Sequence, residues 1–198
     1  TVTVDQKSSL HLATVEAGPA LPTSVRTWSG TSVDQGDEAA AWFSSLLGSP
    51  SRLVYMPDDV HRPIGAKRLV ADGDEISFVD AAPLLLTCTT SLAELQAHMD
   101  EPVPMDRFRA NLVVEGTEPW EEDDWREIRI GTAAFAVVSD CTRCVITTTD
   151  QLDGTRHREP LRTLGQRRRT DDGVRFGRYL VPTVLGEVHV GDIVTVVR

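Results

Sequence analysis

The sequence predicts a mostly β fold with a few helices, closed into a barrel or a folded sheet. After about residue 108, short runs of β-branched and aromatic residues follow one another. Few segments have a helical pattern, and many short strands with few helices indicate a barrel or a folded sheet. The hydrophobic content of 40% and the charged content of 25% are typical of a globular protein. A length of 198 residues fits one domain, or one domain and part of another.

The first 30 residues are expected to form short strands joined by turns. Residues 9–15 alternate between polar and apolar side chains, which is the period of a half-buried strand. Pro19 and Pro22 interrupt this pattern. The stretch therefore predicts a hairpin without a complete partner.

Residues 35–47 have the clearest helical pattern. Asp34 is placed to cap this helix, and Asp37 and Glu38 favour its positive end. Gly48 is expected to end it before Pro50. The face expected to pack inward consists of Ala41, Trp42, Ser45 and Leu46.

Two further strands precede residue 90 in this prediction, at residues 52–56 and 83–87. A turn rich in hydroxyl groups follows the second strand and leads into a helix from Ser91. Ser91 and Glu94 have the spacing of a capping box, in which each side chain satisfies a backbone N–H.

The remainder of the chain is expected to be mostly strands. One helix, near residues 159–169, interrupts them. The predicted strands are residues 112–114, 128–130, 134–138, 145–149 and 190–197.

The charge balance restricts the function. A net charge of −10 argues against non-specific binding to nucleic acid or to an anionic membrane. No apolar run approaches 18 residues and no leader pattern is present, so we expect a cytoplasmic protein. Six arginines nonetheless cluster late, and they suit either a small-anion site or a solvated helix face: Arg156, Arg158, Arg162, Arg167, Arg168 and Arg169.

Three cysteines, Cys88, Cys141 and Cys144, argue for a reducing compartment rather than a disulfide framework. The pair in residues 141–144 has four interpretations. The first three are half of a zinc site, a redox pair, and two ordinary buried thiols. In the fourth, one of the two cysteines supplies a soft thiolate ligand to a transition metal. A zinc site needs two more ligands, and a redox pair should open a helix, whereas a β-branched run follows here.

Two other segments are candidates for binding. Thr89, Thr90 and Ser91 could form an anion site at a helix start, or simply cap that helix. Arg109 and Asn111 precede a strand and could bind a phosphate, or be a surface arginine and a turn asparagine.

Residues 120–125 are acidic and aromatic, but their spacing does not fit a calcium loop. We interpret them as a surface loop anchored by Trp120 and Trp125. The sequence has no glycine-rich phosphate loop, no Gly-x-Ser-x-Gly and no His-Glu-x-x-His, which excludes several common enzyme classes.

Taken together, these segments resemble the MOSC domains of amidoxime-reducing components and their bacterial relatives. The cysteine segment, residues 140–148, is closest to the family pattern, and residues 108–113 resemble its Phe-Arg-Pro-Asn motif, with Ala110 in place of proline. The likeness covers about residues 25–198. Its other segments are residues 83–95, 120–131, 159–164, 176–179 and 190–194.

The resemblance implies a MOSC-type β-barrel with the tail of a truncated N-terminal β domain. Residues 1–56 would be the remnant of that domain with its linking helix, and residues 57–198 the MOSC domain. It also implies binding of the molybdenum cofactor, molybdopterin, with Cys144 as both the metal ligand and the catalytic residue. Pyridoxal phosphate binding, as in distant relatives, is not expected. The cofactor-binding residues implied are Thr89, Thr90, Ser91, Arg109, Asn111, Thr142, Arg143 and Tyr179.

The activity implied by the resemblance is reduction of small N-hydroxylated substrates. Electrons would come from a separate ferredoxin- or flavin-type protein, with no nucleic-acid or membrane partner. Two alternatives stay open: a carrier of sulfur or molybdopterin without turnover of its own, and a structural remnant without cofactor affinity.

Overall fold

The computed structural model describes residues 2–4 and 8–197 and divides into two compact units. Unit 1 comprises Thr1–Pro63 and Glu75–Phe78, and unit 2 comprises Ile64–Asp74 and Val79–Arg198. The residues of the functional motifs all lie in unit 2.

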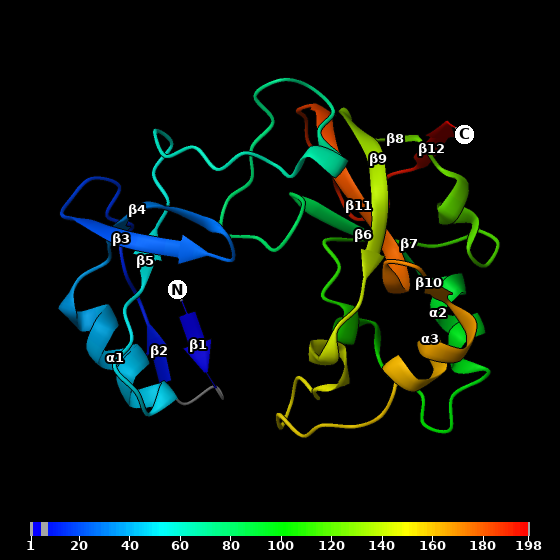
Figure 1. Ribbon diagram of the computed structural model, residues 1–198, viewed down its shortest axis with the longest axis horizontal. Helices are drawn as coiled ribbons and strands as arrows, with labels where there is room; N and C mark the ends of the chain where they lie inside the picture. Colours follow the sequence, from blue (N-terminus) through cyan, green and yellow to red (C-terminus); the bar gives the residue numbers. More distant parts are fainter. Residues whose placement is uncertain (1, 5–7, 198) are drawn as a thin grey trace. The chain divides into compact units, whose positions relative to one another are not determined.

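Unit 1 contains two small antiparallel sheets and one helix (Figure 1). β1 (Val2–Val4) pairs with β2 (Ser8–Leu10). β3 (Ala20–Val25), β4 (Trp28–Asp34) and β5 (Val54–Tyr55) form a three-stranded sheet in that order. α1 (Asp37–Leu47) connects β4 to β5.

The predicted β pattern in unit 1 is partly wrong. The strand expected over residues 9–15 ends at Leu10, and the hairpin is complete, because β3 pairs with β4 along its whole length. Pro22 lies inside β3 rather than ending it. Because β3 is an edge strand, a residue without an N–H is tolerated there.

The helix near residues 35–47 is confirmed, with corrections to its start and to its buried face. It begins at Asp37, and Asp34 accepts a hydrogen bond from Gly36 N at 3.0 Å instead of capping the first turn. Ala39 and Ala40 are its buried residues, rather than the face centred on Ala41 and Leu46. Gly48 ends the helix in the left-handed conformation, as predicted.

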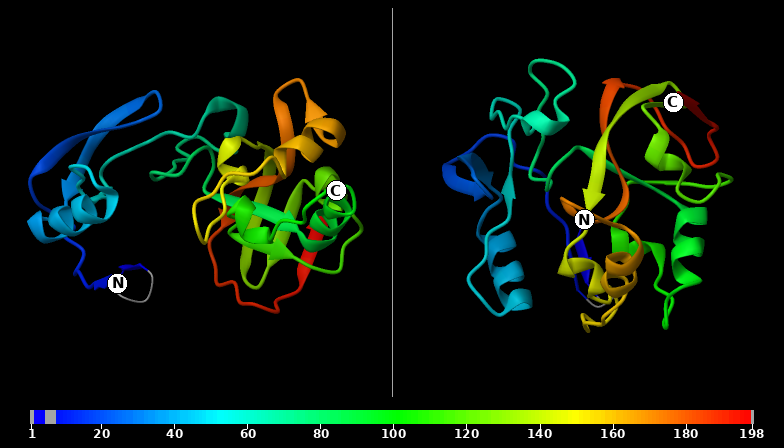
Figure 2. Two further views of the ribbon diagram at one scale, coloured as in Figure 1. Left: turned by 90° about the horizontal axis from the view of Figure 1, so that it is seen from below. Right: turned by 45° about the vertical axis from the view of Figure 1, so that its right-hand side comes forward.

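Unit 2 is built on a seven-stranded sheet that curls into a half-barrel (Figures 1 and 2). The order along the sheet is β12-β8-β9-β11-β6-β7, and β10 (Arg169–Thr170) pairs with β11 off this path. Only β6 and β7 pair in parallel, and the other pairs are antiparallel. The strand bounds are Leu84–Cys88 for β6, Leu112–Val114 for β7, Glu127–Ile130 for β8, Ala133–Thr142 for β9, Gly173–Val184 for β11 and Val194–Val197 for β12.

The helices of unit 2 are short, which confirms the predicted class of mostly β structure with a few helices. α2 (Thr89–Gln96) follows β6, and α3 (Leu161–Arg167) precedes β10. Both lie near the same end of the curled sheet (Figures 1 and 2). The 3₁₀ turns are Ala66–Arg68 (η1), Met105–Phe108 (η2), Glu121–Asp124 (η3) and Val145–Thr148 (η4).

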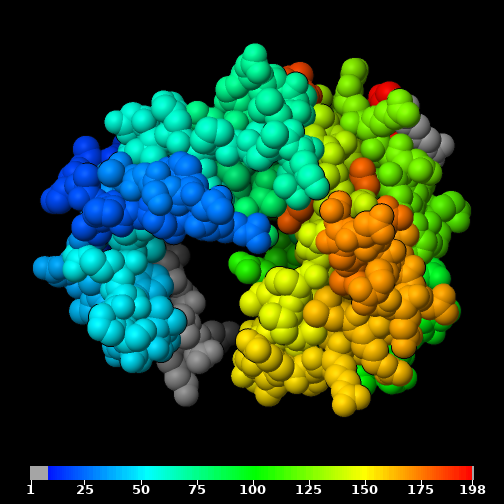
Figure 3. Space-filling model, in the orientation of Figure 1, coloured from blue at the N-terminus to red at the C-terminus, as the bar shows by residue number. Residues whose placement is uncertain are grey.

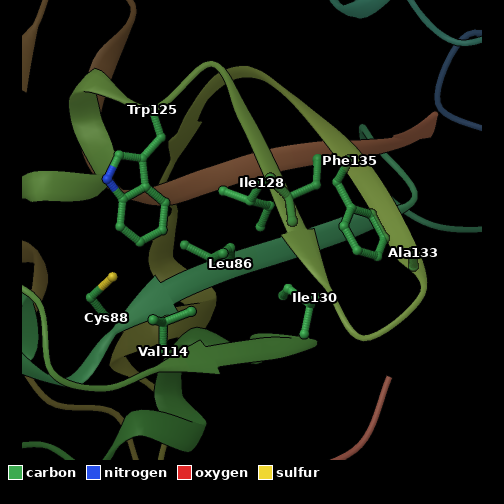
Figure 4. Packing of buried hydrophobic residues seen from close by; sticks show 9 residues of the cluster. Leu86, Cys88, Val114, Trp125, Ile128, Ile130, Ala133 and Phe135 are labelled. Atoms are coloured by element: carbon green, nitrogen blue, oxygen red, sulfur yellow. The ribbon is translucent and has the colours of Figure 1, made fainter. Parts of the chain in front are cut away.

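Two apolar clusters hold unit 2 together. The first lies inside the curl, where Leu86, Trp125, Ile128 and Phe135 pack together (Figure 4). The second lies under the helices and includes Leu92, Leu95, Leu164 and a stacked pair, Phe108 and Phe176, whose ring centroids are 4.0 Å apart. The second cluster joins η2 to β11, and the candidate site lies beside it.

The most central strand, β11, was not among the predicted strands. Its sequence contains Gly177 and Pro182, which obscure the β pattern. The register of β11 with β9 shifts between Arg175 and Arg178, so Gly177 lies at a bulge. Pairing with β6 ends at Leu180, before Pro182.

The strand predicted over residues 145–149 is wrong, because these residues form η4. The hydroxyls of Thr147 and Thr148 donate to the carbonyls of Cys144 and Val145, at 3.0 and 2.7 Å. These local bonds satisfy the carbonyls without a neighbouring strand and override the β preference of the run. The strand expected over residues 190–197 is also shorter and begins at Val194.

Gly177 is the glycine on which the centre of this sheet depends. Its φ is +78°, and a Cβ there would lie 2.5 Å from the Leu86 carbonyl oxygen and 3.4 Å from Arg143 Nη2. Gly191 also has a positive φ, +96°, but nothing lies within 4 Å of a Cβ at that position. A side chain at either glycine would have the cost of a left-handed backbone, but only one at Gly177 would also overlap with neighbouring atoms.

We predict that Gly191→Ala lowers the free energy of unfolding by about 1–2 kcal/mol, the cost of the left-handed conformation. Gly177→Ala should cost about 1–3 kcal/mol more, because β6 must also move. Urea unfolding of both variants measures the difference. Equal losses would show that the close approach of β11 to β6 is not rigid.

Candidate functional site

A row of side chains crosses three strands of unit 2. Leu85 of β6 is in register with Tyr179 of β11, and Tyr179 is in register with Ser139 of β9. Residues directly opposite one another on paired strands share a face of the sheet. Asn111 extends this row beside β6: its N–H donates to the Leu85 carbonyl and its Oδ1 accepts from Leu85 N, both at 2.9 Å. We call Asn111, Leu85, Tyr179 and Ser139 the site row.

The Tyr179 hydroxyl meets the thiol of Cys141, two residues beyond Ser139. Both side chains are buried, with Tyr179 only 8% exposed. Burial raises the pKa of the Tyr179 phenol and that of the Cys141 thiol, so both stay protonated near neutral pH. Cys141 is therefore a neutral, buried thiol that forms part of the packing.

Cys144 differs from the other two cysteines because it is exposed. Its carbonyl accepts hydrogen bonds from the N–H and the hydroxyl of Thr147, at 3.2 and 3.0 Å, which fixes its backbone at the start of η4. The surface formed by the residues after Cys144, in yellow, adjoins that of α3 and the start of β11, in orange (Figure 3). The protein thus presents an exposed thiol from a backbone held in place.

All three cysteines are free thiols. Within residues 2–4 and 8–197, no three His, Cys, Asp or Glu side chains are grouped so that they could hold a metal ion. The extra ligands that a zinc site requires are therefore not assembled around Cys141 and Cys144 in this part of the chain.

Arg143 joins the cysteine segment to the segment of Arg109. Its guanidinium donates from Nε to the Phe176 carbonyl at 2.8 Å and from Nη1 to the Phe108 carbonyl at 2.9 Å. It also lies over the rings of Phe108 and Phe176, 5.3 and 5.9 Å from their centroids. Its Nη2 is buried and has no hydrogen-bond partner among the described residues.

Arg109 follows Phe108 with a positive φ of 53°, and its side chain is exposed. The structure thus brings the backbone of the Arg109 segment to the cysteine segment, through Arg143. A second connection reinforces the first. Arg107 is buried and pairs with Asp150, just beyond η4, with 2.5 Å between Nη2 and Oδ2.

The three hydroxyl residues Thr89, Thr90 and Ser91 form the first turn of α2. Thr90 bonds the hydroxyl of Thr117 at 2.8 Å, and Thr89 makes a long bond of 3.5 Å to the Val114 carbonyl. Among the described residues, no hydrogen bond joins these hydroxyls to Arg109 or Arg143. Their role at a cofactor remains a prediction.

The capping box predicted for Ser91 is wrong, because α2 already begins at Thr89. The Ser91 hydroxyl instead donates to Glu122 at 2.7 Å and accepts from Trp120 N at 2.8 Å. Glu122 is wholly buried, so the acidic stretch is not simply a surface loop. Trp125 does anchor it, since this side chain is 2% exposed.

Two of the six late arginines, Arg162 and Arg168, pair with nearby acidic groups. Arg168 pairs with Asp123 at 2.5 Å and lies 4.1 Å from the ring centroid of Trp120. Arg162 pairs with Asp100 and with Glu159. These pairs offset the charge of Arg162 and Arg168 only, so the choice between a small-anion site and a solvated helix face stays open.

One residue near the site row had no signal in the sequence. Arg68, in η1, donates from Nε to the Ser139 hydroxyl at 3.0 Å, and its guanidinium carbon lies 5.0 Å from the centroid of the Tyr179 ring. A single arginine in a polar loop gives no hint of a partner so distant in the sequence.

Comparisons with known proteins show the family of this chain. Residues 73–195 match the family model of the MOSC domain, and the chain belongs to the MOSC domain family. No helix in the described residues has both the length and the apolar character needed to cross a membrane.

Two similar relatives carry the name mitochondrial amidoxime-reducing component 1. The Xenopus laevis protein is 35% identical over 173 residues, which are 80% of this chain and 50% of that protein. The Homo sapiens protein is 35% identical over 171 residues, covering 80% and 51%. This chain spans about half the length of the curated relatives it matches. The crystal structure of YiiM from Geobacillus stearothermophilus aligns with a TM-score of 0.44 at 15% identity, over 90% of this chain and 71% of that one.

Glu122 generates a prediction about stability and pH. Burial raises the pKa of this carboxyl, so the folded state favours its protonated form. Its stabilising contribution is present at low pH and is lost as pH rises through the folded-state pKa. Glu122→Gln keeps an acceptor for Ser91 but carries no charge at any pH.

We therefore predict that the wild type loses stability relative to Glu122→Gln between about pH 5 and about pH 8. Urea unfolding of both proteins at the two pH values measures this difference. Glu115→Gln, at an exposed position, is the control. A gap between wild type and Glu122→Gln that stays constant with pH would contradict the prediction.

Proposed function

We propose that this protein is the molybdenum-cofactor-binding domain of an oxidoreductase that reduces N-hydroxylated compounds. The observation that carries the proposal is the exposed thiol of Cys144, held at the start of η4 after the strand that contains Ser139 and Cys141. Membership of the MOSC family and the names of the similar relatives support the reaction class.

The donor set suits a metal bound through one protein thiolate. A soft thiolate is a fitting ligand for a transition metal of this kind. Cys144 would hold the metal, whereas Cys88 and Cys141 are buried thiols whose pKa values are raised by burial. The exposed Thr142 and Arg109, with Asn111 and Tyr179 of the site row, would contact the pterin and its phosphate.

The other four predicted cofactor residues already have hydrogen-bond partners within the protein, which restricts how they could bind a ligand. Thr89, Thr90 and Ser91 would have to exchange their present hydrogen-bond partners to reach a ligand. Arg143 has one buried donor left, Nη2, and otherwise positions Cys144 through the main chain.

When bound, the cofactor supplies the two-electron redox chemistry, and the protein supplies binding and orientation. Cys144 would hold the metal just past the end of β9, and the buried Cys141 thiol would pack against Tyr179. Electrons would come from a separate ferredoxin- or flavin-type protein. Residues 1–56 would belong to the N-terminal β domain with its linking helix, and residues 57–198 would form the MOSC domain.

The alternative function is a carrier of sulfur or molybdopterin without turnover. An exposed thiol on a fixed backbone would also serve as a persulfide carrier, so Cys144 is needed in both cases. Reduction of a hydroxylamine or an amidoxime with a reduced viologen dye distinguishes them, since only the reductase turns over.

The two motif cysteines give the sharpest prediction for this function. Cys144→Ala in cofactor-loaded protein should have no detectable reductase activity, because it removes the protein's bond to the metal. Cys141→Ala should keep a substantial part of the activity and lower the free energy of unfolding by about 1 kcal/mol. Viologen-linked turnover and urea unfolding measure the two effects.

An active Cys144→Ala variant would refute the single-ligand account. If both variants fold but are equally inactive, the two cysteines act as a unit, which also contradicts it.

A further inference from the structure

We propose that Arg68 is an anion-binding residue of the same site and that it contacts a phosphate group of the bound ligand. This inference rests on the proposed function, because the phosphate in question is that of molybdopterin. Nothing in the sequence motifs points to Arg68, which lies before the motif segments and before residue 73, where the match to the family model begins.

Two contacts fix the guanidinium of Arg68 beside the site row. Its Nε donates to the Ser139 hydroxyl at 3.0 Å, and its central carbon lies 5.0 Å from the centroid of the Tyr179 ring. Ser139 and Tyr179 are themselves in register on β9 and β11. One hydrogen bond and one ring contact therefore orient a planar cation against two members of the row.

The orientation leaves the terminal nitrogens of Arg68 available. Only Nε is engaged in a hydrogen bond with another described residue, and the side chain is half-buried. An arginine whose plane is already fixed can give two parallel hydrogen bonds to a phosphate with little further loss of conformational freedom.

The other arginines show why the site needs this cation. Arg143 is committed to the carbonyls of Phe108 and Phe176, so its charge faces the protein interior. Arg109 precedes Asn111 at the β7 end of the site row, whereas Arg68 stands at the Ser139 end. The two exposed or half-exposed cations thus bracket the row, in a chain whose net charge is −10.

Lys67 provides a matched control for Arg68. It is the preceding residue in the same 3₁₀ turn, its side chain is 81% exposed, and its amine lies 3.7 Å from Asp172 rather than at the site row. Arg68→Gln and Lys67→Gln each remove one positive charge from η1, so long-range electrostatics change alike in both.

The first measurement is the molybdenum and pterin content of each protein after identical expression in a host that makes the cofactor. Arg68→Gln should weaken cofactor binding about tenfold, the expected scale for a lost charge-assisted contact. Lys67→Gln should retain wild-type content. Arg68→Lys, which keeps the charge but lacks the planar fork, should fall between the two. Equal content in Arg68→Gln and the wild type would overturn the proposal.

The second measurement uses cofactor-free protein and inorganic phosphate. Titration should shift the NMR signals of the Arg68 Nε–H and the Ser139 amide in the wild type and in Lys67→Gln. The Ser139 amide should not respond in Arg68→Gln. Phosphate binding that is unchanged by Arg68→Gln would show that the anion binds elsewhere.

The two measurements separate this inference from the proposed function. If phosphate binding depends on Arg68 but no variant or wild type takes up molybdenum, the anion site stands and the cofactor assignment fails. If the wild type takes up molybdenum and Arg68→Gln does so equally, the cofactor assignment stands and the role of Arg68 fails. Thermal unfolding of each variant confirms that it is folded.

Discussion

The guanidinium of Arg143 is the contact on which the candidate site depends. Its nitrogens donate hydrogen bonds to two main-chain carbonyls from separate segments, those of Phe108 and Phe176, and so hold η2 against β11. A buried carbonyl without a donor costs free energy, so these segments cannot separate freely. Because Arg143 directly precedes Cys144, the same contact sets the position of the thiol relative to Arg109.

Several features of the sequence serve this arrangement. Gly177 allows the backbone of β11 to pass close to the Leu86 carbonyl and to Arg143, in a space that a Cβ would fill. The pair between Arg107 and Asp150 adds a second connection between the same segments. The stacked rings of Phe108 and Phe176 exclude water beside the guanidinium, which strengthens its hydrogen bonds. The result is an exposed thiol on a backbone that is held from several sides.

The sequence predicted the parts of the fold that depend on local patterns. The strands around residues 112–114, 128–130 and 134–138 are confirmed, because each is a short apolar run bounded by turns. β11 escaped prediction because Gly177 and Pro182 interrupt its pattern, although the bulge and the end of its pairing with β6 accommodate both. Residues 145–149 have the sequence of a strand but do not form one. The threonine hydroxyls satisfy the local carbonyls, so η4 forms there instead.

The long-range contacts of the site were beyond sequence reasoning. The bond from Ser91 to Glu122 and that from Arg68 to Ser139 join residues far apart in the chain, and no spacing rule predicts such partners. The motifs nevertheless pointed to Cys144 and Tyr179 as candidates. The register of the sheet places Tyr179 in the site row, and Cys144 lies just past the strand that carries Ser139.

The central claim is that one protein thiolate, that of Cys144, holds the metal. X-ray absorption at the molybdenum edge of cofactor-loaded protein tests it most directly, because the fine structure counts the sulfur neighbours of the metal. The account predicts one more sulfur neighbour in the wild type and in Cys141→Ala than in Cys144→Ala. The same sulfur count in the wild type and in Cys144→Ala would contradict it.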